Sequence, residues 1–154
     1  MRYSLTLMVV AGALAGCTPR SDQEFVDLQH RGQAAMGVDQ YTSTHKFDDL
    51  ADGGRIELQR DENDPRDVAT IRAHLKEVMA AFEKGDFRVP GFVHAQEVPG
   101  TQVMAARHAL IRYAYADLPQ GGQIHLTTSD ADALRAIHEF MAFQRTDHRA
   151  GGHH

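Results

Sequence analysis

Histidine is the residue type best suited to chemistry in this chain, which has ten histidines among 154 residues. Neutral imidazole is the commonest metal ligand in proteins, and the thioether of methionine favours soft ions such as Cu(I). The single cysteine, Cys17, excludes an internal disulfide framework and a cysteine-rich zinc site. A metal site in this chain must therefore use histidine and methionine.

Five side chains are the candidate metal ligands. His94 lies in an irregular stretch that Met104 also occupies. His45 is expected on a strand, on the face that also carries an apolar side chain. His74 is expected at the flank of an apolar helix face, and His138 on the buried side of the last helix. The pattern predicts His45, His94 and Met104 as leading ligands, with His74 and His138 as further candidates.

A metal site here must combine histidines from several elements. His138 and His148 are ten residues apart, or about 15 Å along a straight helix, so they cannot share one ion. The alternative for each candidate histidine is a structural role, hydrogen-bonded within the fold. His125 and His30 are expected at the surface, and His153 and His154 follow two glycines at the end of the chain.

Hydrophobic periodicity and turn residues predict the elements that position these side chains. Helices are expected over residues 22–36, 67–84 and 131–146. Strands are expected over 44–50, 55–59, 107–117 and 123–127, with turns at 52–54 and 119–122. Residues 86–106 are expected to be irregular, except for one or two helical turns over 101–107.

The two hairpin-plus-helix units resemble each other in sequence. Residues 53–58 parallel residues 121–126, and residues 71–73 parallel residues 134–136. The expected fold class is α+β: an N-terminal helix, then a duplicated ββα–ββα unit whose four-stranded, mostly antiparallel sheet carries helices on one face. We expect one domain over residues 24–148 and a flexible tail over 149–154.

The first seventeen residues resemble the signal peptide of a bacterial lipoprotein. Arg2 precedes an apolar run that is too short to span a bilayer, and the run ends in Leu14-Ala15-Gly16-Cys17, which resembles a lipobox. The resemblance implies removal of residues 1–16, lipidation of Cys17 and an acylated tether over 17–23. The alternative is an ordinary secretory signal. The expected location is the cell envelope, facing the periplasm. Resemblance to enterobacterial sorting signals favours the outer membrane, because Thr18 follows the cysteine where an aspartate is the usual retention signal.

Enzyme and nucleic-acid signatures are absent from the sequence. There is no GxSxG, P-loop, GxGxxG or HExxH motif, so no catalytic residue is assigned. The formal charge of −5 disfavours binding to a phosphate backbone. The chain is therefore not expected to be an enzyme or to bind nucleic acid.

Several segments resemble a small exported bacterial family whose function is not settled. They are Met36-Gly37-Val38-Asp39-Gln40 with Thr44-His45-Lys46-Phe47, Ile71-Arg72-Ala73-His74-Leu75, Gly85-Asp86-Phe87, and Ala136-Ile137-His138-Glu139-Phe140 with Phe143-Gln144 and Asp147-His148. The chain departs from that pattern at Val38, where phenylalanine is usual, and at Lys46, where a second histidine is common. Some members are labelled aspartate carbamoyltransferase, but this chain lacks that enzyme's Ser-Thr-Arg-Thr motif and the zinc-binding cysteines of its regulatory chain.

These observations predict an exported, lipid-anchored protein that binds a transition metal through histidine and methionine without catalysis. Copper is favoured over zinc because export and thioether ligands both suit copper. The alternative is a metal-free module of the cell envelope that binds a protein partner or forms a homodimer through its last helix.

Overall fold

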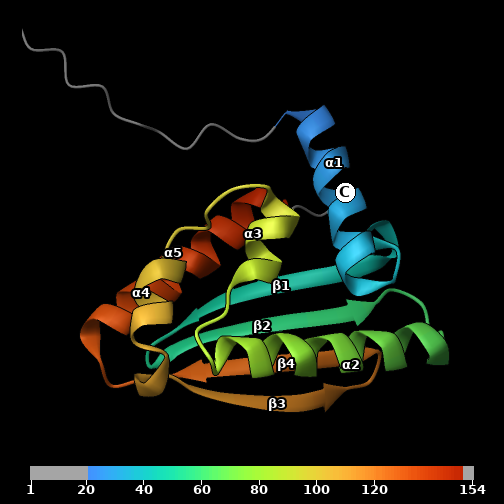
Figure 1. Cartoon of the computed structure of the whole chain (residues 1–154). Coiled ribbons are helices and arrows are strands. Elements are labelled where there is room, and N and C mark those ends of the chain that lie inside the picture. The colour runs from blue at the N-terminus through green and yellow to red at the C-terminus, as the bar shows by residue number, and fades with distance from the viewer. Residues whose placement is uncertain (1–20, 151–154) are drawn as a thin grey trace, which may run out of the picture.

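The computed structural model describes residues 21–150. In chain order, its elements are α1 (Asp22–Met36), the 3-10 turn η1 (Gln40–Thr42), β1 (Ser43–Leu50), β2 (Gly53–Arg60), α2 (Pro65–Phe82), α3 (Arg88–His94), α4 (Thr101–Ala106), the 3-10 turn η2 (His108–Leu110), β3 (Arg112–Leu118), β4 (Gly121–Thr127) and α5 (Ala131–Asp147). Figure 1 shows the strands forming one sheet, with α2 running along it. The signal peptide, Cys17 and most of the expected tether lie outside the described residues.

The sheet confirms the predicted α+β architecture. Its strand order is β1-β2-β4-β3, and every neighbouring pair is antiparallel. In the central pair, Ile56 lies opposite Ile124, Gly53 opposite Thr127 and Gln59 opposite Gly121. Exchanging each residue for its counterpart in the other repeat converts the Gly53–Thr127 pair into the Gly121–Gln59 pair and leaves the Ile56–Ile124 pair unchanged. The two ββα units are therefore related by an approximate two-fold axis that passes between Ile56 and Ile124.

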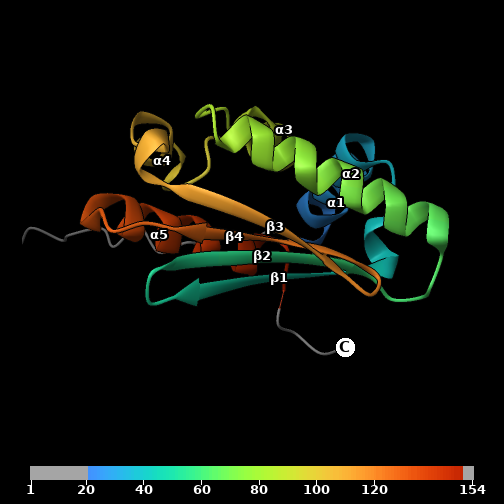
Figure 2. The same ribbon diagram turned by 90° about the horizontal axis from the view of Figure 1, so that it is seen from below.

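The helices pack on one face of the sheet, and one hydrophobic core lies between the two layers. On that face, Ile56, Leu58, Ile124 and Leu126 are buried in the same cluster as side chains from α2 and α5. A Cβ atom on Gly54 would meet side chains of α5, so that helix lies directly on β2. Figure 2 shows α2, α3 and α4 together on one side of the strands.

Side-chain caps explain where the first two long helices begin. Ser21 and Glu24 form a reciprocal capping box at the start of α1, and Gly37 ends that helix in the left-handed conformation. The last two residues of the expected tether therefore belong to α1. Helix α2 begins at Pro65, two residues before the expected start, because Asp64 accepts hydrogen bonds from the first turn and proline suits the first helical position.

The sequence suggested that the glycine pairs form part of the hairpin turns, but they do not. The turns are Ala51-Asp52 and Pro119-Gln120, and each glycine pair begins the following strand. A Cβ atom on Gly53 would lie 1.8 Å from the carbonyl oxygen of Leu126, and one on Gly121 would lie 2.0 Å from that of Leu58. Glycine is required at both positions because β2 and β4 approach closely there.

Residues 86–106 are more regular than predicted. Helix α4 lies where one or two helical turns were expected, but α3 was missed because Pro90 and Gly91 disfavour a helix interior. Pro90 is the third residue of α3, so it lies in the first turn, where its missing N–H costs no hydrogen bond. No helix within residues 21–150 is long and apolar enough to cross a membrane.

The apolar surface of helix α5 packs against other elements of the same chain. Ile137, Phe140 and Met141 are at most 1% exposed. A Cβ atom on Gly100, at the start of α4, would lie 2.1 Å from the carbonyl oxygen of Ala136, so α4 covers one side of α5 while the sheet covers another. These three apolar side chains of the last helix are therefore buried within the chain.

The close approach of the central strands predicts a large cost for a methyl group at Gly53. Gly53→Ala should lower the free energy of unfolding by about 2–4 kcal/mol, because its Cβ would overlap a backbone oxygen that cannot move independently. Urea unfolding measures the loss. The control is Gly91→Ala, whose Cβ would meet only an atom at 3.7 Å and which should keep or slightly raise stability. Equal stability of the two variants would contradict the prediction.

Candidate functional site

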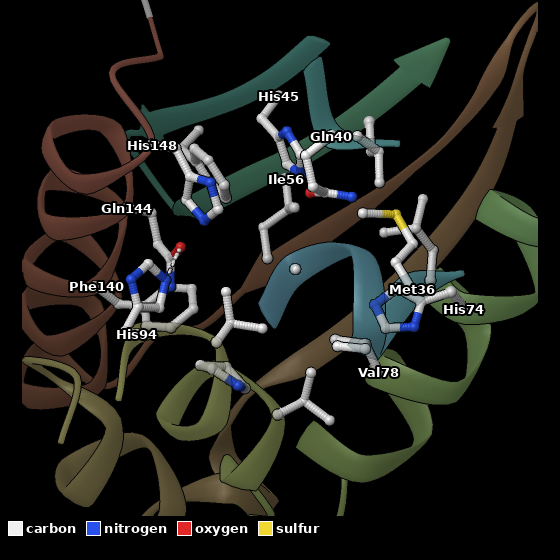
Figure 3. A pocket seen from close by; sticks show the side chains of 18 of the residues that line it. Met36, Gln40, His45, Ile56, His74, Val78, His94, Phe140, Gln144 and His148 are labelled. Atoms are coloured by element: carbon white, nitrogen blue, oxygen red, sulfur yellow. Dashed lines mark hydrogen bonds between the residues drawn. The ribbon is translucent and has the colours of Figure 1, made fainter. Parts of the chain in front are cut away.

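Four histidines from four elements line one pocket (Figure 3). His45 lies on β1, His74 on α2, His94 at the end of α3, and His148 directly after α5. The cavity volume is about 100 Å³. The rest of the wall is mostly apolar and comes from α1, η1, β1, β2, α2, α3 and α5. The pocket is therefore an apolar cavity whose polar groups are mainly imidazoles.

Stacked rings hold His45 in place. Its ring stacks on His148, with centroids 4.8 Å apart, and on Phe47 at 6.0 Å. The ring of His94 meets His148 edge-on at 5.0 Å. Within residues 21–150, neither ring nitrogen of His45 makes a hydrogen bond, and the same holds for the half-buried His74. Both residues can therefore offer a ring nitrogen to a ligand in the pocket.

His94 is buried and has a different set of contacts. Its Nδ1 is hydrogen-bonded to Oδ2 of Asp147, and its Nε2 lies 2.9 Å from Oε1 of Gln144. Both partners lie in the last turn of α5, which places α3 against that helix. Because both ring nitrogens are engaged, His94 forms part of the wall and orients its neighbours.

Met36 and Gln40 bring two further polarisable or polar groups to the pocket. Met36 is the last residue of α1 and is 7% exposed. The Gln40 amide donates to the carbonyl oxygen of Val38 at 3.0 Å. A Cβ atom on Gly32 would lie 2.9 Å from the Gln40 side chain, so glycine there allows Gln40 to pack against α1.

Burial favours the neutral form of two of the pocket imidazoles. Desolvation, together with the nearby His74 and His94, lowers the pKa of His45 to about 4. Desolvation also lowers the pKa of His74, although Glu77 opposes that shift. A neutral imidazole has a free lone pair, which is the form that binds a metal ion.

The structure brings together three of the five predicted ligands. His45, His74 and His94 line the pocket, but Met104 and His138 do not. Met104 is fully buried in the hydrophobic core, where its thioether fills space between apolar side chains. His138 Nε2 lies 2.9 Å from the carbonyl oxygen of Leu50 and 3.0 Å from that of Gly53, so its imidazole braces the turn between β1 and β2.

Sequence reasoning did not assign Met36, Gln40, Gln144 or His148 to the site. One local signal was available, because Gln144 and His148 are four residues apart and so share a helix face. A second signal was the set of segments that resemble the exported family, since they contain all four of these residues as well as His45 and His74. Their distance along the chain hid the convergence.

The pocket is not arranged as a conventional zinc or calcium site. Within the part of the chain that the structure describes, no three His, Cys, Asp or Glu side chains are placed to hold one metal ion. The stacked rings of His45 and His148 place their planes side by side. A metal ion in this pocket therefore needs a ligand of another type or a rotation of an imidazole.

The lowered pKa of His45 predicts how stability depends on pH. The unfolded chain takes up a proton near pH 6.5, whereas folded His45 takes it up only near pH 4. The free energy of unfolding should therefore fall between pH 6.5 and pH 4, by about 3 kcal/mol at most, with His74 adding in the same direction. Urea unfolding across this pH range measures the slope.

Replacing His45 should make the free energy of unfolding less dependent on pH. His45→Gln should lose most of the decrease between pH 6.5 and pH 4, whereas His30→Gln, at an exposed position on α1, should retain it. A slope that is unchanged in His45→Gln would show that the pH dependence originates elsewhere.

Comparisons with known proteins found no match among protein-family models, curated proteins or solved structures. The function must therefore be argued from the pocket itself.

Proposed function

We propose that this protein is a lipid-anchored binding protein of the bacterial cell envelope that holds a transition metal ion in its histidine pocket, with copper favoured over zinc. It faces the periplasm, with the outer membrane as the favoured site of attachment through Cys17. The observation that carries the proposal is the convergence of four histidines from four elements on one small cavity.

A metal ion accounts for the kind of polar group in the pocket. His45 and His74 both leave their ring nitrogens without hydrogen bonds within residues 21–150, although both side chains line the pocket. Their lone pairs are therefore available to an ion that enters the pocket.

The donor set favours copper. The side chains that line the pocket offer imidazole, thioether and amide groups, and they include no carboxylate, thiol, hydroxyl or amine. Zinc sites commonly use four ligands drawn from Cys, His and carboxylates, whereas imidazole and thioether together suit copper. The same lining offers no hydroxyl, thiol, amine or carboxylate nucleophile, which supports binding without catalysis.

The interaction-module alternative has less support. It drew on the apolar residues of the last helix, and the most apolar part of that helix is covered by α4 and the sheet within one chain.

Direct titration tests the proposed metal site. The protein would comprise residues 18–150 without an affinity tag, which keeps every pocket residue and omits His153 and His154. The protein would be titrated with Cu(I), Cu(II) and Zn(II). We expect it to bind one equivalent of Cu(I), of Cu(II), or of each. The melting temperature should rise as well, because a ligand present at 100 times its Kd stabilises the native state by about 2.7 kcal/mol.

Matched histidine variants locate the site. His45→Gln and His74→Gln should each weaken copper binding at least tenfold. His138→Gln changes the residue at the β1–β2 turn, so it should lower stability by about 1 kcal/mol without changing affinity. Absence of stoichiometric binding, or equal affinity in all three variants, would overturn the proposal.

A further inference from the structure

We infer that the pocket is selective for Cu(I), which is held by the imidazoles of His45 and His74 and the thioether of Met36. This inference rests on the proposed metal site and adds to it a redox state and a sulfur ligand. The three side chains come from β1, α2 and the end of α1 and line the same cavity.

Met36 is the methionine positioned for this role. Of the described methionines, it alone lines the pocket. Figure 3 shows its side chain between Gln40 and His74 at the edge of the pocket. The backbone of Met36 is fixed by the left-handed C-cap of Gly37, whose N–H donates to the carbonyl oxygen of Gln33 at 2.7 Å. The thioether therefore reaches the cavity from a rigid helix end.

The two imidazoles are free to coordinate, while the other two hold the wall. His45 and His74 leave their ring nitrogens without hydrogen bonds within residues 21–150. His94 is held by Asp147 and Gln144. His148 stacks on the face of His45 at a centroid distance of 4.8 Å, so we assign it as a positioning residue that orients His45.

The cavity wall favours a soft monovalent ion over a divalent one. Moving a charge from water into an apolar site is costly, and the cost rises steeply with the charge of the ion. No carboxylate lines the pocket to balance a second positive charge. Cu(I) carries a single charge, prefers thioether and imidazole donors, and is satisfied by few ligands, whereas Cu(II) prefers a tetragonal set of nitrogen and oxygen donors.

The test compares two methionine variants of similar volume. Met36→Leu removes the proposed sulfur ligand, and Met104→Leu makes the same chemical change in the core, away from the pocket. The wild-type protein of residues 18–150 and both variants would be titrated anaerobically with Cu(I) against a chromophoric Cu(I) chelator, and separately with Cu(II) and with Zn(II). X-ray absorption of each Cu(I)-loaded protein would report whether sulfur is bound to copper.

We expect the wild type to bind Cu(I) at least tenfold more tightly than Cu(II) or Zn(II). Met36→Leu should weaken Cu(I) binding at least tenfold, lose the sulfur signal and leave any Zn(II) binding unchanged. Met104→Leu should match the wild type in all three measurements. This combination would establish the thioether as a ligand.

Other results separate the two proposals. Copper binding that depends on His45 and His74 but is unchanged in Met36→Leu, with no sulfur signal, would overturn the Cu(I)–thioether assignment and leave the histidine site standing. Equal losses in Met36→Leu and Met104→Leu would overturn it as well, because packing would then explain the effect. Failure of the wild type to bind any metal ion would overturn both proposals.

Discussion

Strands β2 and β4 meet backbone to backbone because glycine stands where a side chain would strike a carbonyl oxygen of the partner strand. Gly53 and Gly121 occupy equivalent places at opposite ends of this contact, as the approximate two-fold axis requires. The contact fixes the register of the whole sheet, since β1 and β3 each pair with one member of it. It also leaves one apolar face, on which α2 and α5 bury their core residues.

The pocket breaks the symmetry that the central strands impose. His45 lies opposite Leu58 in the first hairpin, and the equivalent residue of the second hairpin, opposite Leu126, is Tyr113. The first repeat unit therefore carries an imidazole where the second carries a phenol ring. Helices α1 and α3 lie outside the repeated units and close the cavity on the side of β1. The duplication thus supplies the sheet, and the added helices complete the wall of the histidine pocket over one half of it.

The sequence revealed what depends on local periodicity and concealed what depends on contacts between distant segments. Period-2 and period-3.6 patterns located the four strands and the three long helices. The glycine pairs were misinterpreted as turns. Glycine is needed there because the neighbouring strand approaches closely, and no local sequence signal shows that contact. Met104 and His138 looked suitable by residue type, but core packing and a turn occupy them. Met36 reaches the pocket from the end of α1, and His148 reaches it just after α5, where its ring stacks on His45.

Hydrogen bonding, more than residue type, divides the histidines of this protein by role. His138 is engaged by carbonyl oxygens at the β1–β2 turn, and His94 by a carboxylate and an amide at the end of α5, so both stabilise the framework. His45 lies among rings and apolar side chains that lower its pKa and satisfy neither nitrogen. An imidazole kept neutral in this way costs the fold stability as the pH falls, and that cost is understandable if the lone pair serves a ligand. His94 forms part of the cavity wall without entering its chemistry, because Asp147 and Gln144 engage both of its ring nitrogens.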